Sequence, residues 1–183
     1  MKNQMQPVTV AIADTDRGRR AGYERLLQGE SGIKLFTNGA SGKEAGDEKL
    51  LSGYPNDRAF VNRRLKPRTN VTANEDEVAR IKRLKPLVLL VNLNLCTDED
   101  YTLLLSLRHE CPEALMVFLA DNSVHEDTIL KVLEIGARGY LKYETVQFHL
   151  SGAIQAVGRG EAWVPRKMLG NIMDHMLSQQ ANA

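Results

Sequence analysis

Five short apolar runs that alternate with segments of helical spacing constrain the fold of this chain more than any other feature. The apolar runs cover residues 8–13, 32–36, 87–91, 115–119 and 139–141. The segments with helical spacing cover residues 17–28, 77–85, 98–110, 124–135 and 146–159. Runs that are apolar throughout indicate strands that are buried on both faces. Buried strands joined by helices predict an α/β domain, in which a parallel sheet has helices on both of its faces.

The stretch of residues 38–74 interrupts this alternation. It is rich in Gly, Asn, Lys, Asp and Arg and has no clean periodicity. Because a structureless stretch of this length is unusual in a compact domain, we expect either an insertion with its own small elements or a mobile lobe. The second strand is ambiguous for the same reason, since residues 69–73 compete with residues 32–36 for its place. We therefore expect a single domain over residues 1–160 that contains this insertion.

Residues 161–183 follow as a linker and a last helix. The amphipathic segment 165–180 carries a stripe of apolar side chains, which includes Met168, Leu169, Ile172, Met173 and Met176. Such a stripe predicts contact with a second copy of the chain or with an adjacent domain. The alternative is that the helix folds back on its own domain.

Composition and charge narrow the classes of protein to consider. Hydrophobic residues make up 43% of the chain and charged residues 26%, which is the balance of a globular protein. The net charge of +1 gives the whole molecule no strong attraction to DNA or to acidic membranes. Cys96 and Cys111 have neither metal-ligand spacing nor the pattern of a disulfide framework. No segment is apolar enough for a signal peptide or a transmembrane helix, so we expect a cytoplasmic protein.

Polar side chains follow four of the predicted strands. The carboxyl ends of parallel strands meet at one edge of the sheet, and the functional crevice of such folds lies there. The candidate site therefore consists of the residues that arrive at this edge, which are Asp14, Thr15, Asn92, Ala120, Asp121, Lys142 and Tyr143.

Three segments of the sequence resemble the receiver domains of LuxR-type (NarL-type) two-component response regulators. Residues 136–141 read GARGYL and residues 160–165 read GEAWVP, and both are similar to the closing part of that family. Residues 85–92 read KPLVLLVN where family members read RPDVVLLD. The resemblance covers everything except the insertion and the last residues. It implies a flavodoxin-like three-layer α/β/α sandwich with five strands in the order 2-1-3-4-5 and an extra C-terminal helix.

The resemblance also implies a phosphorylation chemistry. In the family, two acidic residues after the first strand help to bind Mg²⁺, and an aspartate that ends the third strand accepts a phosphoryl group. A Thr or Ser after the fourth strand and a Lys after the fifth strand then sense the phosphate. The matching positions here hold Asp14 and Thr15, then Asn92, then Ala120 or Asp121, then Tyr143 with Lys142 beside it.

This chain departs from the family at four of these positions. An asparagine amide at position 92 cannot form an acyl phosphate, although a single loss of this kind could be accidental. Because the other departures accompany it, we predict that the phosphorylation chemistry is lost and that the receiver is degenerate.

The asparagine also changes the charge of the pocket. An amide in place of a carboxylate lowers the negative charge, so we expect no requirement for Mg²⁺ and no other cofactor. Asn92 can hydrogen-bond Asp14 or a backbone group and thereby hold one fixed conformation. For Asp14 we favour a cap on nearby amides over a metal ligand. Lys142 either pairs with Asp14 or Asp121 or is solvated.

These observations predict an atypical, phosphorylation-independent receiver that controls transcription by protein–protein contact. We expect a homodimer, with another regulatory protein as an alternative partner, and DNA binding only through a helix-turn-helix beyond this chain. The competing hypothesis is a stand-alone adaptor or a module that senses a ligand such as a cyclic dinucleotide. Its candidate patch is the basic run 58–68, with Arg58, Arg63, Arg64, Lys66 and Arg68. No nucleophile–base pair or cofactor loop is visible, so we expect no enzymatic activity.

Overall fold

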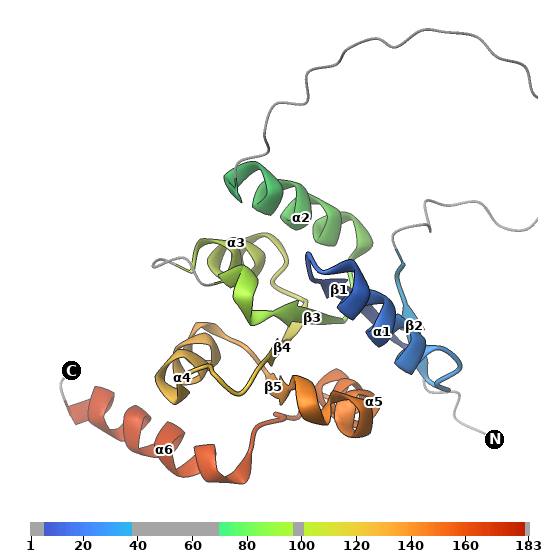
Figure 1. Ribbon diagram of the computed structural model, residues 1–183. Helices are drawn as coiled ribbons and strands as arrows, with labels where there is room; N and C mark the ends of the chain where they lie inside the picture. Colours follow the sequence, from blue (N-terminus) through green and yellow to red (C-terminus); the bar gives the residue numbers. More distant parts are fainter. Residues whose placement is uncertain (1–5, 38–69, 97–100, 182–183) are drawn as a thin grey trace, which may run out of the picture.

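The computed structural model of this chain describes residues 6–37, 70–96 and 101–181. Its centre is a parallel sheet of five strands in the order β2-β1-β3-β4-β5 (Figure 1). The strands are β1 (Val8–Ala13), β2 (Ile33–Leu35), β3 (Val88–Asn92), β4 (Leu115–Ala120) and β5 (Gly139–Lys142). The predicted fold class and strand order, those of a flavodoxin-like α/β/α sandwich, are therefore confirmed.

Helices cover both faces of the sheet (Figure 1). They are α1 (Arg17–Leu27), α2 (Asn70–Leu84), α3 (Thr102–Glu110), α4 (Glu126–Ile135), α5 (Val146–Gly158) and α6 (Arg166–Ala181). Two short 3₁₀ turns, η1 (Leu93–Cys96) and η2 (Tyr143–Thr145), follow β3 and β5. Helices α1 and α5 pack on one face, and α2, α3 and α4 pack on the other.

Each face of the sheet has its own hydrophobic core. On one face, Ile81, Leu104 and Val132 pack against β3 and β4. On the other face, Leu27 of α1 and Ile154 of α5 pack in one core with side chains of the sheet. The whole of β3 is buried, as expected for the central strand of a sheet that is covered on both sides. Burying a side chain of this size stabilises the fold by about 1.5–3 kcal/mol, so these two layers fix the position of the strand ends.

The structure resolves the ambiguity of the second strand. Residues 33–35 pair with β1 in parallel register, with Val8 opposite Ile33 and Val10 opposite Leu35. Residues 70–73, the competing candidate, belong to α2. That helix begins seven residues before the predicted start at residue 77, and residues 38–69 of the expected insertion lie outside the described residues.

Helix α3 also differs from its prediction. The segment of helical spacing begins at Asp98, a residue suited to an N-cap, which lies outside the described residues. The helix starts at Thr102 after Tyr101, which has left-handed backbone angles (φ 50°). The helical spacing of residues 98–110 predicts that Leu104, Leu105 and Leu107 face inward, but Leu105 is half exposed, and Leu103 is buried instead. The inward face of α3 is therefore set by the packing of Leu103, Leu104 and Leu107 in the core, and the apolar spacing alone did not predict it.

The chain after α5 returns to the edge of the sheet at Trp163. The Trp163 N–H donates to the Arg138 carbonyl at 2.9 Å, and the Tyr140 N–H donates to the Trp163 carbonyl at 2.9 Å. These bonds cover the outer edge of β5, which would otherwise present unpaired backbone groups. The expected boundary between residues 160 and 161 lies just before this contact.

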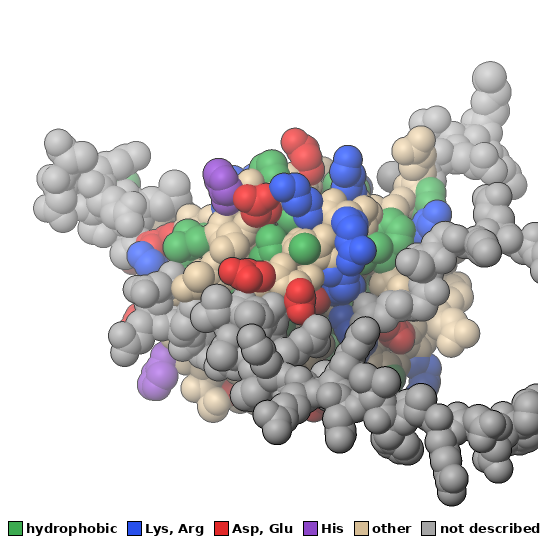
Figure 2. All heavy atoms as spheres, turned by 90° about the horizontal axis from the view of Figure 1, so that it is seen from above, with side chains coloured by type: hydrophobic (Ala, Val, Ile, Leu, Met, Phe, Trp, Pro, Cys, Tyr) green, Lys and Arg blue, Asp and Glu red, His purple; other side chains and the backbone are tan. Residues whose placement is uncertain are grey.

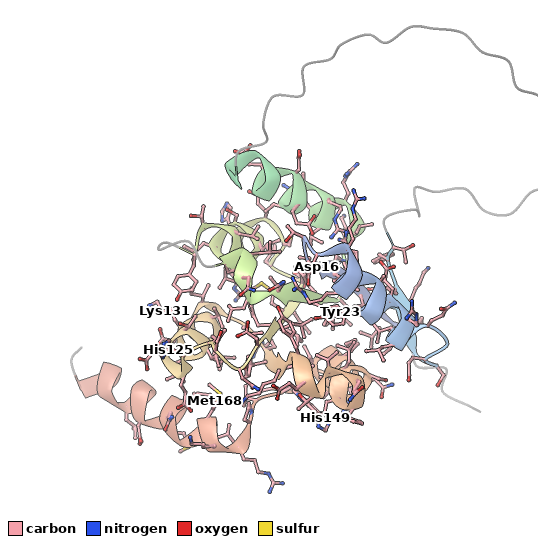
Figure 3. All side chains as sticks on the ribbon, in the orientation of Figure 1. Asp16, Tyr23, His125, Lys131, His149 and Met168 are labelled. Carbon is pink, nitrogen blue, oxygen red and sulfur yellow. The ribbon has the colours of Figure 1, made fainter. Side chains whose placement is uncertain are left out.

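Helix α6 contacts the domain through the start of its apolar stripe. Met168 is buried against the core that α2, α3 and α4 share, and Ile172 is half-buried against it. Figure 3 shows Met168 on the side of α6 that faces the domain. None of the described helices is long and apolar enough to cross a lipid bilayer.

Candidate functional site

The carboxyl ends of β1, β3 and β5 bring together three of the residues that the sequence singled out. Asp14 follows β1, Asn92 is the last residue of β3, and Tyr143 follows β5. Asp14 and Asn92 are the two polar residues that are fully buried in the described part of the chain. Buried polar groups are costly unless they are hydrogen-bonded, so their partners define what the site can do.

Asp14 is enclosed by hydrogen-bond donors from the start of α1. The side chain of Asp14 is 1% exposed. Arg19 Nε donates to Asp14 Oδ2 at 2.9 Å, and Arg19 Nη2 donates to Asp14 Oδ1 at 3.0 Å. The backbone N–H of Asp16 donates to the same Oδ1 at 2.8 Å. The carboxylate therefore caps a backbone amide and forms a bidentate ion pair.

The hydrogen bonds at the start of α1 favour the charged forms of Arg19 and Asp16. Its hydrogen bonds to Asp14 raise the pKa of the Arg19 guanidinium further above its ordinary value, although partial burial opposes this. Asp16, the N-cap of α1, accepts a hydrogen bond from the backbone N–H of Arg19 at 2.9 Å. Because that bond favours the ionised form, the pKa of the Asp16 carboxyl lies below its ordinary value.

Asn92 is held by Tyr143 from the opposite side of the site. The Tyr143 hydroxyl donates to Asn92 Oδ1 at 2.7 Å, and the backbone N–H of Asn94 donates to the same oxygen at 2.9 Å. The guanidinium of Arg19 lies over the Tyr143 ring, with 5.3 Å between its carbon and the ring centroid. This contact is a cation–π interaction, and it joins the Asp14 ion pair to the Asn92 hydrogen bond. We call these four residues, Asp14, Arg19, Tyr143 and Asn92, the strand-end network.

The other residues singled out by the sequence lie outside this network. Asp121 accepts hydrogen bonds from the side chain and the backbone N–H of Ser123, and these bonds lower the pKa of its carboxyl. Ala120 is buried, and Thr15 is exposed. Lys142 is also exposed and takes part in none of the ion pairs of the described residues. Since Arg19 binds both oxygens of Asp14, this carboxylate pairs with Arg19 rather than with Lys142.

The residues at this site do not fit the Mg²⁺ ion that the resemblance implies. Mg²⁺ prefers several oxygen ligands in a nearly octahedral arrangement. Both carboxylate oxygens of Asp14 bind Arg19, and Asn92 Oδ1 already accepts two hydrogen bonds. Thr15 replaces the second acidic residue and points to solvent. Within the described ranges, no cluster of three His, Cys, Asp or Glu side chains is arranged to hold a metal ion.

Sequence reasoning missed Arg19 and Tyr23. Arg19 is five residues after Asp14, and the first turn of α1 returns its side chain to the end of β1, but this spacing alone does not distinguish it from Arg17 and Arg20. The Tyr23 hydroxyl is buried and has no hydrogen-bond partner among the described residues. Burial raises its pKa, and the nearby Tyr143 and Asp14 raise it further. Tyr23 and Asp16 both lie on the α1 side of the site (Figure 3).

The last helix, α6, adds no residue to the strand-end network. Residues 58–68, with all five of their cations, lie outside the described residues. On the face shown in Figure 2, Lys and Arg side chains gather in a band, with several acidic side chains next to it. Charges of both signs therefore share this face.

Comparisons with known proteins agree with the architecture. No protein-family model matches the chain, and no curated protein matches its sequence. Among solved structures, it is similar to a LuxR-family two-component response regulator from Aurantimonas sp. SI85-9A1, with a TM-score of 0.61 and 16% identity over 94% of this chain and 99% of that one.

Two further similar structures contain RcsB. The isolated receiver domain of RcsB from Salmonella enterica serovar Typhimurium has a TM-score of 0.61 and 16% identity over 91% of this chain and 98% of that one. RcsB dimers bound to DNA have a TM-score of 0.60 and 14% identity over 92% of this chain and 69% of that one. At these identities the similarity establishes that the chain has the fold of receiver domains, and the site must indicate what this chain does with that fold.

Proposed function

We propose that this chain is a phosphorylation-independent receiver domain that regulates transcription by protein–protein contact. It would form the regulatory part of a LuxR-type regulator and act as a homodimer in the cytoplasm, without catalytic turnover. DNA would be bound by a helix-turn-helix outside residues 1–183. The receiver architecture and the strand-end network together carry this proposal.

The decisive observation is the hydrogen bonding of Asn92. An acyl phosphate needs a carboxylate at this position, and the amide oxygen here instead accepts bonds from Tyr143 and from the backbone of Asn94. The neighbouring carboxylate, Asp14, is neutralised by Arg19. Asp14 and Asn92, the two buried polar side chains of the site, are thus already paired within the domain. This favours one constant conformation over a switch between two.

The second part of the proposal concerns the partner. The solved structure of RcsB dimers on DNA shows that a protein with this fold can act in that form. In the present chain, α6 leaves an apolar stripe of Leu169, Met173 and Leu177 exposed. A second copy that covers this stripe would remove it from water. We therefore assign the dimer contact to α6.

Intact-mass spectrometry after incubation with Mg²⁺ and acetyl phosphate tests the loss of phosphorylation. We expect no phosphoryl group on the wild-type chain. A phosphorylatable receiver domain that is incubated in the same tube shows that the donor is active. A phosphoryl adduct on the wild-type chain would contradict the proposal, and peptide mapping of that adduct would identify the residue that accepts it.

A binding assay with DNA or with a partner protein, on the full-length protein, tests whether the conformation is constant. The affinity should be the same with and without the phosphodonor. Any change that depends on the donor would mean that the domain is still a switch.

A further inference from the structure

The guanidinium of Arg19 occupies the only cation-binding carboxylate of the strand-end network. It contacts both oxygens of Asp14, at 2.9 and 3.0 Å, in the side-on geometry of a bidentate pair. The Asp14 side chain is 1% exposed and that of Arg19 is 34% exposed, so the pair lies at the inner end of the site with its cation toward solvent. An incoming metal ion would have to displace the guanidinium before it could reach the carboxylate.

Arg19 also joins the two halves of the network. Its guanidinium stacks over Tyr143, whose hydroxyl binds Asn92. A divalent cation would bind the strand-end oxygens, but its hydration shell would not reproduce the contact of the guanidinium with the ring. The arginine therefore neutralises the acidic side and orients the aromatic side in a single arrangement.

The adjacent arginine provides a natural comparison. Arg20 Nη2 donates to the backbone carbonyl of Ile12 at 2.8 Å, and the described hydrogen bonds and ion pairs of the Arg20 side chain include neither Asp14 nor Asp16. The two arginines carry the same charge and lie on the same turn of α1. They differ in whether they occupy the carboxylate.

We propose that Arg19 is a built-in cation that takes the place of the divalent metal and excludes it from the site. This inference rests on the proposed function and deepens it, because it names the group that keeps the receiver fold free of metal and phosphate. It also means that restoring the missing aspartate alone does not restore a metal site. The carboxylate introduced at position 92 would meet a site whose other carboxylate is already paired with Arg19.

Isothermal titration calorimetry with Mg²⁺ as the only ligand tests this inference on four forms of the chain. These are the wild type, Asn92→Asp, Asn92→Asp/Arg19→Ala and Asn92→Asp/Arg20→Ala. We expect no binding heat for the wild type and at most weak binding for Asn92→Asp. The Arg19→Ala double variant should bind at least about tenfold more tightly than Asn92→Asp, because a unit charge in contact with the carboxylate has been removed. The Arg20→Ala double variant should resemble Asn92→Asp.

Several outcomes would overturn the inference. One is equal Mg²⁺ affinity in Asn92→Asp and in its Arg19→Ala derivative, and another is no binding by that derivative. A third is an equal gain from Arg20→Ala, since this would show a general effect of charge. Circular dichroism establishes that each variant is folded, and Arg19→Gln replaces Arg19→Ala if the latter is not.

Failure of this inference and failure of the proposed function give different experimental results. Phosphorylation of the wild-type chain would contradict the proposed function. The inference about Arg19 fails only on the Mg²⁺ affinities of Asn92→Asp and its two double variants.

Discussion

At the scale of single residues, the hydrogen bond between Tyr143 and Asn92 decides how firmly the site is closed. Asn92 is 1% exposed, so its amide oxygen cannot exchange a lost partner for bulk water. This oxygen accepts hydrogen bonds from the backbone N–H of Asn94 and from the Tyr143 hydroxyl. A substitution can remove the hydroxyl, but it cannot remove the backbone N–H. A change at Tyr143 therefore tests the network without removing the buried amide.

Tyr143→Phe should lower the free energy of unfolding by about 1 kcal/mol, the usual net value of one hydrogen bond. Urea denaturation measures this difference. In an Asn92→Ala background the same substitution should cost almost nothing, because its partner oxygen is already absent. Equal costs in both backgrounds would show that the hydroxyl contributes through another contact.

The pKa of Tyr143 leads to a prediction for alkaline solution. Burial raises this pKa above the ordinary value of 10.0, although the charge of Arg19 opposes the shift. The neutral phenol is therefore favoured in the folded state. Its contribution to stability is complete below pH 10.0 and is lost as the pH rises through the folded-state pKa. Above pH 10.0 the stability of Tyr143→Phe should consequently fall less steeply than that of the wild type, as measured by urea denaturation at a series of pH values. Parallel curves for the two proteins would contradict this.

The sequence could supply the positions of Asp14 and Asn92 but not the way in which they are paired. Both residues follow apolar runs, and such runs end at a known edge of a parallel sheet. The pairing of Asp14 depends on the rotation of α1 about its axis and on the rotamer of Arg19, and neither leaves a periodic signal. Arg19, Arg20 and Arg17 look alike in the sequence, yet only Arg19 binds the carboxylate.

At the scale of elements, the close packing of α5 against β1 depends on one glycine. A Cβ atom on Gly158 would lie 2.8 Å from Val8 Cγ2 and 3.0 Å from Val8 Cγ1. The β-branched side chain of Val8 has few alternative rotamers, so it cannot easily move aside. The glycine thus allows the end of α5 to approach the start of β1.

Gly158→Ala should destabilise the domain by about 1–3 kcal/mol through overpacking. Gly22→Ala is the matched control, because a Cβ at this position in α1 meets no atom within 4 Å. This control should be neutral or stabilising by up to about 1 kcal/mol, since alanine favours the helix. Adding Val8→Ala to Gly158→Ala should recover part of the loss, and a double variant that is less stable than either single variant would contradict the packing argument.

Elements with strong periodicity were predictable, and the errors concern elements that depend on tertiary contacts. Strand β3 is apolar up to its last residue, Asn92, and the predicted run 87–91 matches it to within one residue at each end. Strand β2 has only three residues, and its partner β1 defines it, so its sequence could not exclude residues 69–73. In α3, Leu103 is buried in place of Leu105, because the side that faces the core depends on how the helix packs.

At the scale of the whole molecule, α6 is the element whose packing is incomplete. Its first residues are held by the domain, since Met168 is buried and Ile172 is half-buried. Further along, Met173 is 63% exposed and Leu177 is 62% exposed. With Leu169 they recur every four residues, which places them on one side of the helix. Such a stripe is suited to a matching stripe on a second copy, because a two-fold axis brings identical surfaces together.

Met173→Glu should weaken the proposed dimer by at least about tenfold, because a charge would be buried without a partner at the contact. Sedimentation equilibrium over a range of protein concentrations measures the effect. Leu105→Glu on α3 is the matched control, since Leu105, like Met173, is an exposed apolar side chain but lies on another helix. Phe148→Glu tests the competing contact, because Phe148 is exposed on α5. If the wild type is monomeric at every concentration, or if only Phe148→Glu dissociates the dimer, then α6 is not the contact, and its exposed stripe must be covered by something other than a second copy.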